Sequence, residues 1–451
     1  MALDRRKFLK AIGLFAGATV AIPAAAATDT SVAGLDAAHL GVRPGRPDDQ
    51  TLLLQRAIDQ ATSTRRALTL AAGVYRVSGV SLPAGAQLIG VPGATRLVAT
   101  RGKPIVTASN ADGVRVSGLI FDGGGQPLPT GQGLLSLANG RNVRILDCEL
   151  IGSARFGIAL DSIEGEVSGN TVIGAADAAM FALDSRGLRI SGNRVRRAGN
   201  NGILVWRRQA GEDGTIVAEN HIEDVSNRDG GDGPYGNGIN VFRAGNVIVR
   251  NNRIRACVFS AVRANAASNI QIIGNHCSDL GEVALYAEFG FEGAIIAHNT
   301  VEGAGHGISV TNFNEGGRLA VVHANIVRNI APQAHARTPS HDHGVGIHVE
   351  ADTAVTGNVV EKAARVGIMV GWGRYLRDVT VTGNVVREAD IGIGVSVVAG
   401  AGAALIANNL IARARSGAII GMDHMRPATA DLATEGAARP SLLAISGNQV
   451  N

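Results

Sequence analysis

Seven side chains able to bind or transfer protons occupy equivalent positions of a sequence repeat that contains the pattern Gly-Ile-x-Val. In a strand, the residue between Ile and Val points away from both of them, as does the residue that follows Val. If Ile and Val are buried, these positions lie on the outer surface. Neighbouring strands lie about 4.8 Å apart, so four consecutive repeats would gather the set within roughly 15 Å. The set, completed by the residue before one Gly, is Arg263, Asn265, Tyr286, Glu288, His306, His348 and Glu350.

Acid–base chemistry on an acidic polysaccharide is the first reaction that fits these side chains. A polysaccharide lyase or C5-epimerase needs a base for the proton next to a uronate carboxylate, a cation that neutralises that carboxylate, and, in a lyase, an acid at the leaving oxygen. Tyr286 or His348 would serve as base or acid, and Arg263 would neutralise the carboxylate. Lys103 and Lys362 are the only lysines beyond residue 27, which disfavours a lysine base.

Glycoside hydrolysis with inversion is an alternative, because it uses two carboxylates about 6.5–9.5 Å apart. Glu288 and Glu350 stand two repeats apart, which corresponds to about 9.6 Å at the usual strand spacing. His306, directly before the Gly of its repeat, adds an imidazole to the catalytic candidates. A solvated polar strand face would also explain the whole set, since one face of such a strand normally contacts water.

Four further residues are candidates for substrate binding. Asn240 and Asn265 offer amide groups on the same outward face, and Trp206 and Trp372 flank the polar set at its two ends, where their rings could stack on sugars. A glycan is therefore the partner that this face predicts, either as a substrate or as the ligand of a non-catalytic binding protein.

A metal site is a separate hypothesis. His341 and His343, with His335 nearby, offer imidazole ligands suited to Zn²⁺ or Cu²⁺. Nothing in the sequence requires a cofactor, so its identity is unknown and a metal ion is the candidate. A periplasmic protein that binds a metal, a cofactor or a glycan without catalysis stays open as an alternative.

A repeated Asn-containing motif is the strongest structural signal. Each unit combines short Val- and Ile-rich runs with Gly and Asn, the residues that tight turns tolerate. Units of roughly 25 residues cannot bury their own apolar face and must stack on their neighbours. The sequence therefore predicts an all-β fold: a single-stranded, right-handed parallel β-helix. The motif Asn recurs roughly every 25 residues, at 170, 193, 220, 252, 275, 299, 325, 358, 384, 409 and 448.

The segment before the repeats has a different pattern. Residues 52–61 show helical spacing of apolar residues after Asp48 and Asp49, either of which is a candidate N-cap. A helix here would cover the exposed strand edges at the end of the solenoid. We divide the chain into a signal peptide (1–27), an N-terminal cap with the first coils (28–100) and the β-helix repeats (101–451).

Composition excludes several classes. Of 451 residues, 45% are hydrophobic and 18% are charged, which excludes wholesale disorder. No apolar run is long enough for a transmembrane helix, which takes about 18 residues or more. The formal net charge of +4 comes mostly from the first 27 residues, so no basic surface for nucleic acid is expected. Cys148, Cys257 and Cys277 are predicted to be small buried residues.

The N-terminus resembles a twin-arginine export signal. Asp4–Lys10 reads D-R-R-K-F-L-K, an apolar stretch follows, and Ala24–Ala27 provides small residues for cleavage. The resemblance implies that the twin-arginine export machinery is a partner and that the mature protein works in the periplasm or is secreted.

Two further resemblances concern the rest of the chain. The elements D-D-x-T, A-I-D-x-A, G-x-Y and L-I-G, between residues 48 and 90, resemble the opening of pectate-lyase-like β-helix proteins. Together, the repeat and the leader resemble a family of twin-arginine-translocated repeat proteins of unknown activity. The G-H-G around His306 is similar to an element of polygalacturonases, but their paired Asp is replaced here by Glu282-Val283. These resemblances imply a fold and transfer no catalytic residue.

Overall fold

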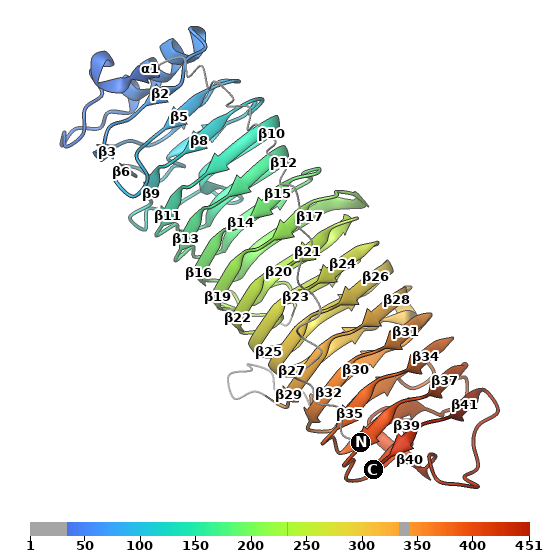
Figure 1. Ribbon diagram of the computed structural model, residues 1–451. Coiled ribbons are helices and arrows are strands. Elements are labelled where there is room, and N and C mark those ends of the chain that lie inside the picture. The colour runs from blue at the N-terminus through green and yellow to red at the C-terminus, as the bar shows by residue number, and fades with distance from the viewer. Residues whose placement is uncertain (1–33, 232, 333–342) are drawn as a thin grey trace, which may run out of the picture. The chain divides into compact units, whose positions relative to one another are not determined.

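The computed structural model describes residues 34–231, 233–332 and 343–451. Over these residues the chain winds into a right-handed parallel β-helix, in which successive turns add strands to three sheets that run along the solenoid (Figure 1). The predicted fold class is thereby confirmed. The leader, residues 1–27, and His341 lie outside the described residues.

Sheet I carries the Gly-Ile repeat, and four of its strands bend around a corner and also belong to a neighbouring sheet. Its strands are β4 (Val80–Ser81), β7 (Val106–Ala108), β10 (Gly133–Leu146), β12 (Phe156–Ser168), β14 (Ala178–Leu183), β17 (Asn201–Glu212), β20 (Asn237–Gly245), β23 (Val262–Asn265), the second half of β25 (His276–Glu288), the second half of β27 (Thr300–Val310), β30 (Val345–Val349), β33 (Val366–Val370), β36 (Ile391–Ser396) and β39 (Gly417–Asp423).

Sheet II follows sheet I in each turn and also receives the ends of β10 and β12. Its own strands are β1 (Leu35–Asp36), β2 (Leu68–Thr69), β5 (Gln87–Ile89), β8 (Arg115–Ser117), β15 (Arg189–Ser191), β18 (Ile216–Ala218), β21 (Ile248–Arg250), β24 (Ile270–Ile273), β26 (Glu292–Ala297), β28 (Arg318–His323), β31 (Thr353–Thr356), β34 (Val379–Thr382), β37 (Ala404–Ala407) and β41 (Leu443–Ser446).

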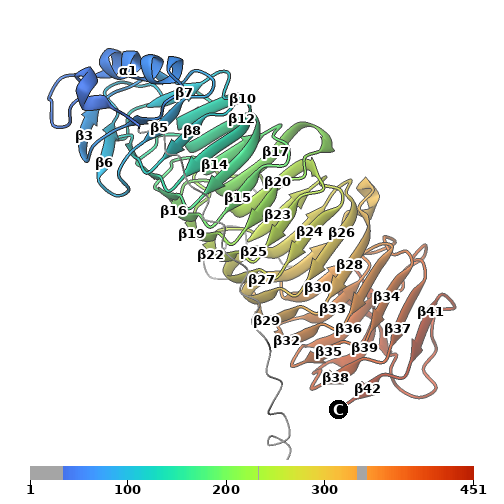
Figure 2. The same ribbon diagram turned by 45° about the horizontal axis from the view of Figure 1, so that its top comes forward.

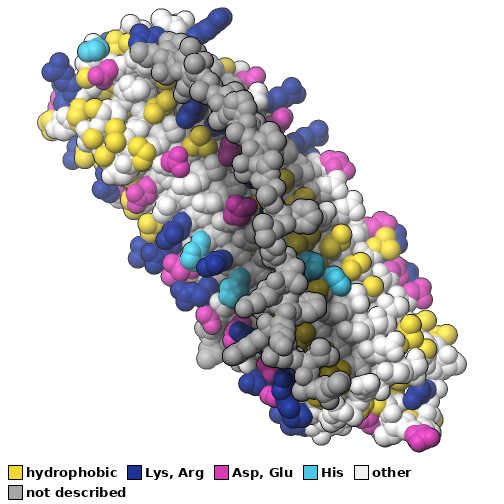
Figure 3. All heavy atoms as spheres, in the orientation of Figure 1, with side chains coloured by type: hydrophobic (Ala, Val, Ile, Leu, Met, Phe, Trp, Pro, Cys, Tyr) yellow, Lys and Arg dark blue, Asp and Glu magenta, His cyan; other side chains and the backbone are white. Residues whose placement is uncertain are grey.

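Sheet III completes each turn and includes the first halves of β25 and β27. Charged side chains gather along this edge of the solenoid (Figure 3). The remaining strands of sheet III are β3 (Gly73–Arg76), β6 (Thr95–Val98), β9 (Ile120–Asp122), β11 (Glu149–Ile151), β13 (Thr171–Ile173), β16 (Arg194–Ala198), β19 (His221–Val225), β22 (Arg253–Cys257), β29 (Ile326–Ile330), β32 (Val359–Ala363), β35 (Val385–Arg387), β38 (Leu410–Ala412) and β42 (Gln449–Val450).

Aliphatic side chains fill the interior because parallel register stacks like on like. In sheet I, Leu285 pairs with Ile308 and Ile308 with Ile347, and all three are fully buried. Gly precedes these Ile residues for a steric reason: a Cβ on Gly307 would lie 2.2 Å from the carbonyl oxygen of Gly346 on the next strand. The Gly of the Gly-Ile pattern is therefore required by the close packing of consecutive turns. The three cysteines are buried and free, as predicted.

The recurring Asn side chains form a hydrogen-bonded ladder at the corner between sheets II and III. The Nδ2 of Asn275 donates to Oδ1 of Asn299 (3.0 Å) and to the carbonyl of Val249 (3.0 Å), and that Oδ1 also accepts the backbone N–H of Asn275 (2.8 Å). The same contacts join Asn299 to Asn325. Burial of these amides is tolerated because both ends of each amide are satisfied.

Helix α1 (Thr51–Ser63) covers the N-terminal end of the solenoid (Figure 2). The predicted helix at 52–61 is confirmed. The N-cap position is taken by Gln50, and Asp49 acts from one residue earlier, where its carboxylate accepts the N–H of Thr51 (2.8 Å). The η2 turn (Ala37–Leu40) precedes α1.

At the C-terminal end, residues 417–431 form a hairpin. Strand β40 (Arg426–Asp431) pairs antiparallel with β39, and the carboxylate of Asp431 accepts the backbone N–H groups of Ala418 and Ile419. No helix in the described residues has the length and apolar character required to cross a bilayer.

Candidate functional site

The predicted polar set lies on consecutive strands of sheet I. Arg263 of β23 pairs with Tyr286 of β25, Tyr286 with Ser309 of β27, and Ser309 with His348 of β30. Asn265 and Glu288 pair with each other two residues further along the same strands. The sequence-based prediction that these residues share one face is therefore confirmed.

One repeat is shifted by one residue relative to its sequence alignment. The Gly-Ile pattern is absent from β14, and its pairing with β12 places Phe181 opposite Ala159 and Leu183 opposite Asp161. The sequence alignment of the repeats predicts Ala182 and Asp184 at these outward positions instead. The correct register leaves Ala182 buried and exposes an aromatic ring on the sheet.

A cavity of about 320 Å³ opens on this face. Six of the predicted site residues line it, together with side chains from the turn after β27 and from the C-terminal hairpin. The lining consists of Glu282, Val283, Tyr286, His306, Ser309, Thr311, Asn312, Asn314, His343, Val345, His348, Glu350, Met369, Trp372, Tyr375 and Met425.

Glu350 is an acidic group of this cavity whose pKa is shifted by its surroundings. Burial raises the pKa of its carboxyl to about 7, against backbone hydrogen bonds from Phe313 and Asn312 that favour the ionised form. The N–H of Phe313, in the η3 turn (Phe313–Glu315), donates to Oε2 of Glu350 at 2.7 Å. A carboxyl group with this pKa is part protonated at neutral pH and can donate a proton.

Two histidines of the cavity are neutral. Burial lowers the pKa of His306 to about 3, with the neighbouring His348 and His343 acting in the same direction. Burial lowers the pKa of His348 to about 4, and a hydrogen bond with the Gly371 backbone opposes this only in part. The Nε2 atom of His348 is buried and has no hydrogen-bond partner among the described residues. An unprotonated, unpartnered imidazole nitrogen in a cavity is a candidate base.

Arg263 and Glu288 bind each other. The guanidinium donates from Nε to Oε1 (2.6 Å) and from Nη2 to Oε2 (2.9 Å), and Nη1 lies 3.4 Å from Oε2 of Glu282. Asn265 donates a further hydrogen bond to Glu288 (3.0 Å). The charge of Arg263 is therefore already neutralised, and both carboxylate oxygens of Glu288 already accept hydrogen bonds. The two residues stabilise the contact between β23 and β25.

Tyr286 contacts the guanidinium of Arg263 from the neighbouring strand. The Arg263 guanidinium sits 5.1 Å from the centre of its ring, and its hydroxyl bonds to Thr311. Burial, reinforced by the charge of Glu288, raises the pKa of the phenol well above its usual range. Tyr286 therefore keeps its proton and can donate a hydrogen bond or a proton, whereas the role of base would require ionisation that its surroundings oppose.

Aromatic side chains form one wall. The ring of Trp372 lies 5.8 Å from His348 and 5.1 Å from His424 of the β39–β40 hairpin, measured between ring centres, and is half-buried. Tyr375 lines the same wall. Trp206 and Asn240, the other predicted binding residues, lie further along sheet I, where the indole Nε1 donates to the Asn240 amide oxygen (3.1 Å).

The predicted metal site is only partly within the described residues. His343 lines the cavity, with its ring 6.2 Å from that of His306, but His341 lies outside the described part of the chain. Within residues 34–231, 233–332 and 343–451, no three His, Cys, Asp or Glu side chains are arranged to hold a metal ion.

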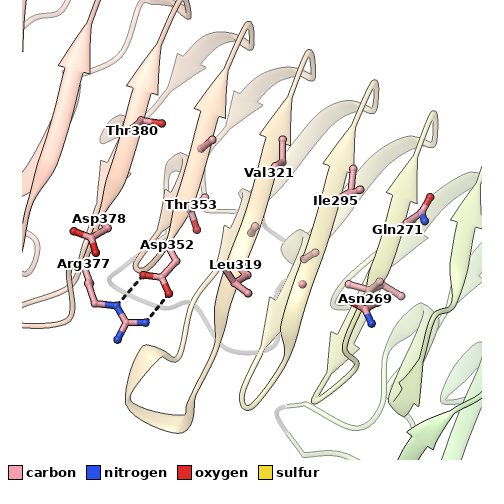
Figure 4. Close-up of a pocket in the computed structure, with 15 residues that line it drawn as sticks. Asn269, Gln271, Ile295, Leu319, Val321, Asp352, Thr353, Arg377, Asp378 and Thr380 are labelled. Carbon is pink, nitrogen blue, oxygen red and sulfur yellow. Dashed lines mark hydrogen bonds and ion pairs between the residues drawn. The ribbon is translucent and has the colours of Figure 1, made fainter.

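A larger hollow, of about 970 Å³, lies on sheet II and has a different lining (Figure 4). Its floor is aliphatic, with Ile295, Leu319 and Val321 about 40% exposed. Two of the charged groups at its edge form an ion pair, in which Arg377 donates to Asp352 through two nitrogens (2.8 and 2.6 Å). This hollow is the larger of the two, but none of its lining residues has the orphaned base or raised carboxyl pKa found on sheet I.

Sequence reasoning missed several cavity residues. Asn312 and Asn314 belong to a turn, and Tyr375 and Met425 come from loops outside the strand repeat. A repeat alignment assigns positions only within strands, so it carries no signal for these residues. Glu282 lies in β25 at the corner where the strand passes from sheet III to sheet I and its register shifts. The one clue was the resemblance of the G-H-G element to polygalacturonases, since Glu282-Val283 stands where that family carries its paired Asp.

Comparison with known proteins supports the fold. The sequence model of a family described as the right-handed β-helix region matches residues 97–222 and 209–386. No curated protein matches the chain.

Solved structures with similar folds come from several sources. PfbA, a surface adhesin of Streptococcus pneumoniae, is 12% identical, with 91% of this chain and 99% of that chain covered and a TM-score of 0.53. The catalytic unit of a GH87 α-1,3-glucanase from Streptomyces thermodiastaticus is 14% identical, with coverages of 93% and 69% and a TM-score of 0.51. A tailspike protein of E. coli bacteriophage HK620 is 11% identical, with coverages of 90% and 76% and a TM-score of 0.54. At these identities the likeness concerns the fold alone. Since the family model covers well over half of the sequence, the chain belongs to the right-handed β-helix family.

Proposed function

We propose that this protein is a carbohydrate-active enzyme that cleaves a glycosidic bond in the cavity on sheet I. One observation carries the proposal: a carboxyl group with a pKa of about 7, Glu350, lines the same small cavity as the neutral His348 and the half-buried ring of Trp372. An acid, a base and a stacking surface are what such cleavage requires.

In the proposed hydrolysis, water attacks the anomeric carbon and gives its proton to Nε2 of His348. The glycosidic C–O bond breaks, and the leaving oxygen takes the proton of Glu350. Tyr286 and His306 border the reacting atoms, and Arg263 and Glu288 act as positioning residues because they are bound to each other. None of the described lining residues is Lys or Arg, which favours a neutral sugar at the reacting position.

Elimination or epimerisation on a uronate is the second candidate. Tyr286, which keeps its proton, and His348, which is neutral, occupy one column of sheet I with only Ser309 between them. This pair could supply the acid and the base of a lyase. The second candidate requires a group other than Arg263 to neutralise the uronate carboxylate.

The neighbouring folds are consistent with a glycan ligand. One is a glucanase, and the HK620 tailspike, as a double mutant, has been solved in complex with a pentasaccharide. The adhesin among them leaves a non-catalytic binding role as an outcome of the experiment.

The experiment incubates the full mature chain with dextran, soluble starch, polygalacturonate and alginate. New reducing ends report any cleavage, and absorbance of an unsaturated sugar reports elimination. The variant is Glu350→Gln, and the matched control is Glu302→Gln, which removes a carboxylate from a surface ion pair on sheet III. We expect cleavage by the wild type and the control and a large loss in Glu350→Gln. Binding without cleavage would make the protein a glycan-binding module, and neither binding nor cleavage would contradict the proposal.

We also propose twin-arginine export to the periplasm or beyond, supported by the paired Arg5 and Arg6 of the leader. Replacement of both residues by Lys should keep the protein in the cytoplasm. Unchanged fractionation of this variant would contradict the proposed route.

A further inference from the structure

Four aromatic rings on sheet I form a continuous row away from the cavity. We call this row the aromatic ladder: Phe156, Phe181, Trp206 and Phe242, from the consecutive strands β12, β14, β17 and β20. Adjacent ring centres are 4.9, 5.6 and 5.7 Å apart. Phe156 is buried, whereas the other three rings are half-buried and present part of their surface to the outside.

The aromatic ladder lies on only one of the three sheets. Aromatic residues make up only 4% of the chain. On the described strands of sheets II and III, no outward position is occupied by Phe, Tyr or Trp; the aromatics there, Tyr75 and Phe121, point into the core. A row of partly exposed rings on one of three otherwise equivalent sheets indicates a ligand that covers them.

The surroundings of the ladder indicate what that ligand is. A groove of about 570 Å³ beside it is lined by Phe181 and Ala159 and by hydrogen-bonding groups of Gln132, Ser136, Asp161 and Arg208. Apolar rings combined with a few fixed polar groups suit the flat C–H face and the hydroxyl rim of a pyranose sugar.

The charges of this groove are balanced internally. Arg208 is bound to both Asp161 and Asp184, with its Nη2 2.7 Å from Oδ2 of Asp161. These interactions leave no unpaired charge on the groove side chains, which favours uncharged sugars over uronates or sulfated sugars. Asn240 fixes the orientation of the Trp206 ring through its hydrogen bond to Nε1.

The ladder and the cavity share one sheet. From Phe181 to His348 the register passes through six strand-to-strand steps, which amounts to about 29 Å at the usual spacing. We infer that the aromatic ladder is a second glycan-binding site, which takes neutral sugars of a linear polymer whose distant segment occupies the cavity. The link to the cavity rests on the proposed function, but binding at the ladder can be measured without any reaction.

The two tryptophans of the chain make this inference testable, because one lies in the ladder and the other in the cavity wall. In Trp372→Phe, indole emission reports the ladder alone, and in Trp206→Phe it reports the cavity alone. Each variant is titrated with dextran, soluble starch, polygalacturonate and alginate, and with short oligosaccharides of any polymer that binds.

We expect a saturable change in Trp206 emission with a neutral polymer. Adding Phe181→Ala to the Trp372→Phe background should weaken this binding about three- to tenfold, whereas Phe289→Ala, which removes an exposed ring outside the ladder, should not change it. Oligosaccharides too short to reach both sites should bind more weakly than the polymer, since they lose the linked second contact.

The results separate the two proposals. Emission of Trp206 that no polymer changes, or that responds equally in Phe181→Ala, would overturn the ladder as a glycan site even if the wild type cleaves a glycan. A Trp206 response without cleavage by the wild type would leave the ladder standing and contradict the proposed enzyme.

Discussion

The outward faces of sheets I and III are both polar, yet they differ in what their polar groups do. On sheet III, charges pair at the surface: Glu223 lies between Arg196 and Arg255, and Arg328 binds Glu302. The hydrogen bond from Arg255 lowers the pKa of Glu223, whereas burial raises that of Glu350 on sheet I.

This difference indicates how a functional site can be recognised on a fold built from repeats. Both sheets have the same strand spacing and the same alternation of inward and outward side chains. Polar residues at the outward positions therefore do not by themselves distinguish a functional site from a solvated surface. Sheet III is what a solvated polar face looks like in this molecule, with complementary ion pairs at its surface. Sheet I differs because turns and a hairpin cover its polar groups, and covering changes their protonation.

The largest expected effect comes from removing the acid of sheet I. Glu350→Gln should lower the rate of glycan cleavage by about 10²–10⁴-fold, the usual contribution of a positioned general acid. Initial rates of reducing-end release measure this. Glu302→Gln on sheet III should keep the wild-type rate, and equal losses in the two variants would erase the distinction between the faces.

Breaking one ion pair on each sheet should have unequal effects on stability. Arg263→Ala leaves the buried Glu288 carboxylate without its partner, and we expect a loss of about 3–5 kcal/mol. Arg328→Ala disrupts an exposed pair and should cost about 0–1 kcal/mol. Urea unfolding followed by circular dichroism compares the variants. Matching losses would show that burial of the sheet I pair has no energetic consequence.

Acid should destabilise the protein through the buried histidines of sheet I. The pKa values of His306 and His348 are lowered to about 3 and 4, so the unfolded chain binds more protons than the folded chain once the pH falls below about 6.5. Stability should therefore fall as the pH drops from 6.5 to 4, by roughly 2–3 kcal/mol per histidine.

Melting temperatures across this range measure the acid effect. The double variant His306→Gln/His348→Gln should show a flatter dependence on pH. A variant of the half-buried His221 of sheet III provides the control, and a steeper curve in the double variant would contradict the account.

The smallest effect concerns a single hydroxyl. Thr311→Val removes the hydrogen-bond partner of the Tyr286 phenol and should cost about 1 kcal/mol. The matched substitution Thr300→Val, on the outward face of sheet III, should stay within about 0.5 kcal/mol. Urea midpoints check both values, and an equal cost at the two positions would mean that the Thr311 hydroxyl has no special role.

The sequence was sufficient for the fold and for the shared face because both follow from periodicity. Gly before Ile, and Asn at each corner, mark steric and hydrogen-bonding requirements that recur in every turn. The repeat failed at β14, where Phe181 replaced the expected Ala182, because that strand lacks the Gly-Ile pattern that fixes the alignment. It also could not show that Arg263 and Glu288 would neutralise each other, since pairing depends on side-chain geometry.

Protonation of Glu350 is the most direct measure of the central claim that sheet I carries an acid at neutral pH. Infrared difference spectra between wild type and Glu350→Gln, recorded from about pH 5 to pH 9, isolate the carboxyl band of this residue. The account predicts a protonated carboxyl that is lost with a midpoint near pH 7, the value to which burial raises the pKa of Glu350. A midpoint at about pH 4.3, the ordinary value of a glutamate side chain in water, would contradict it.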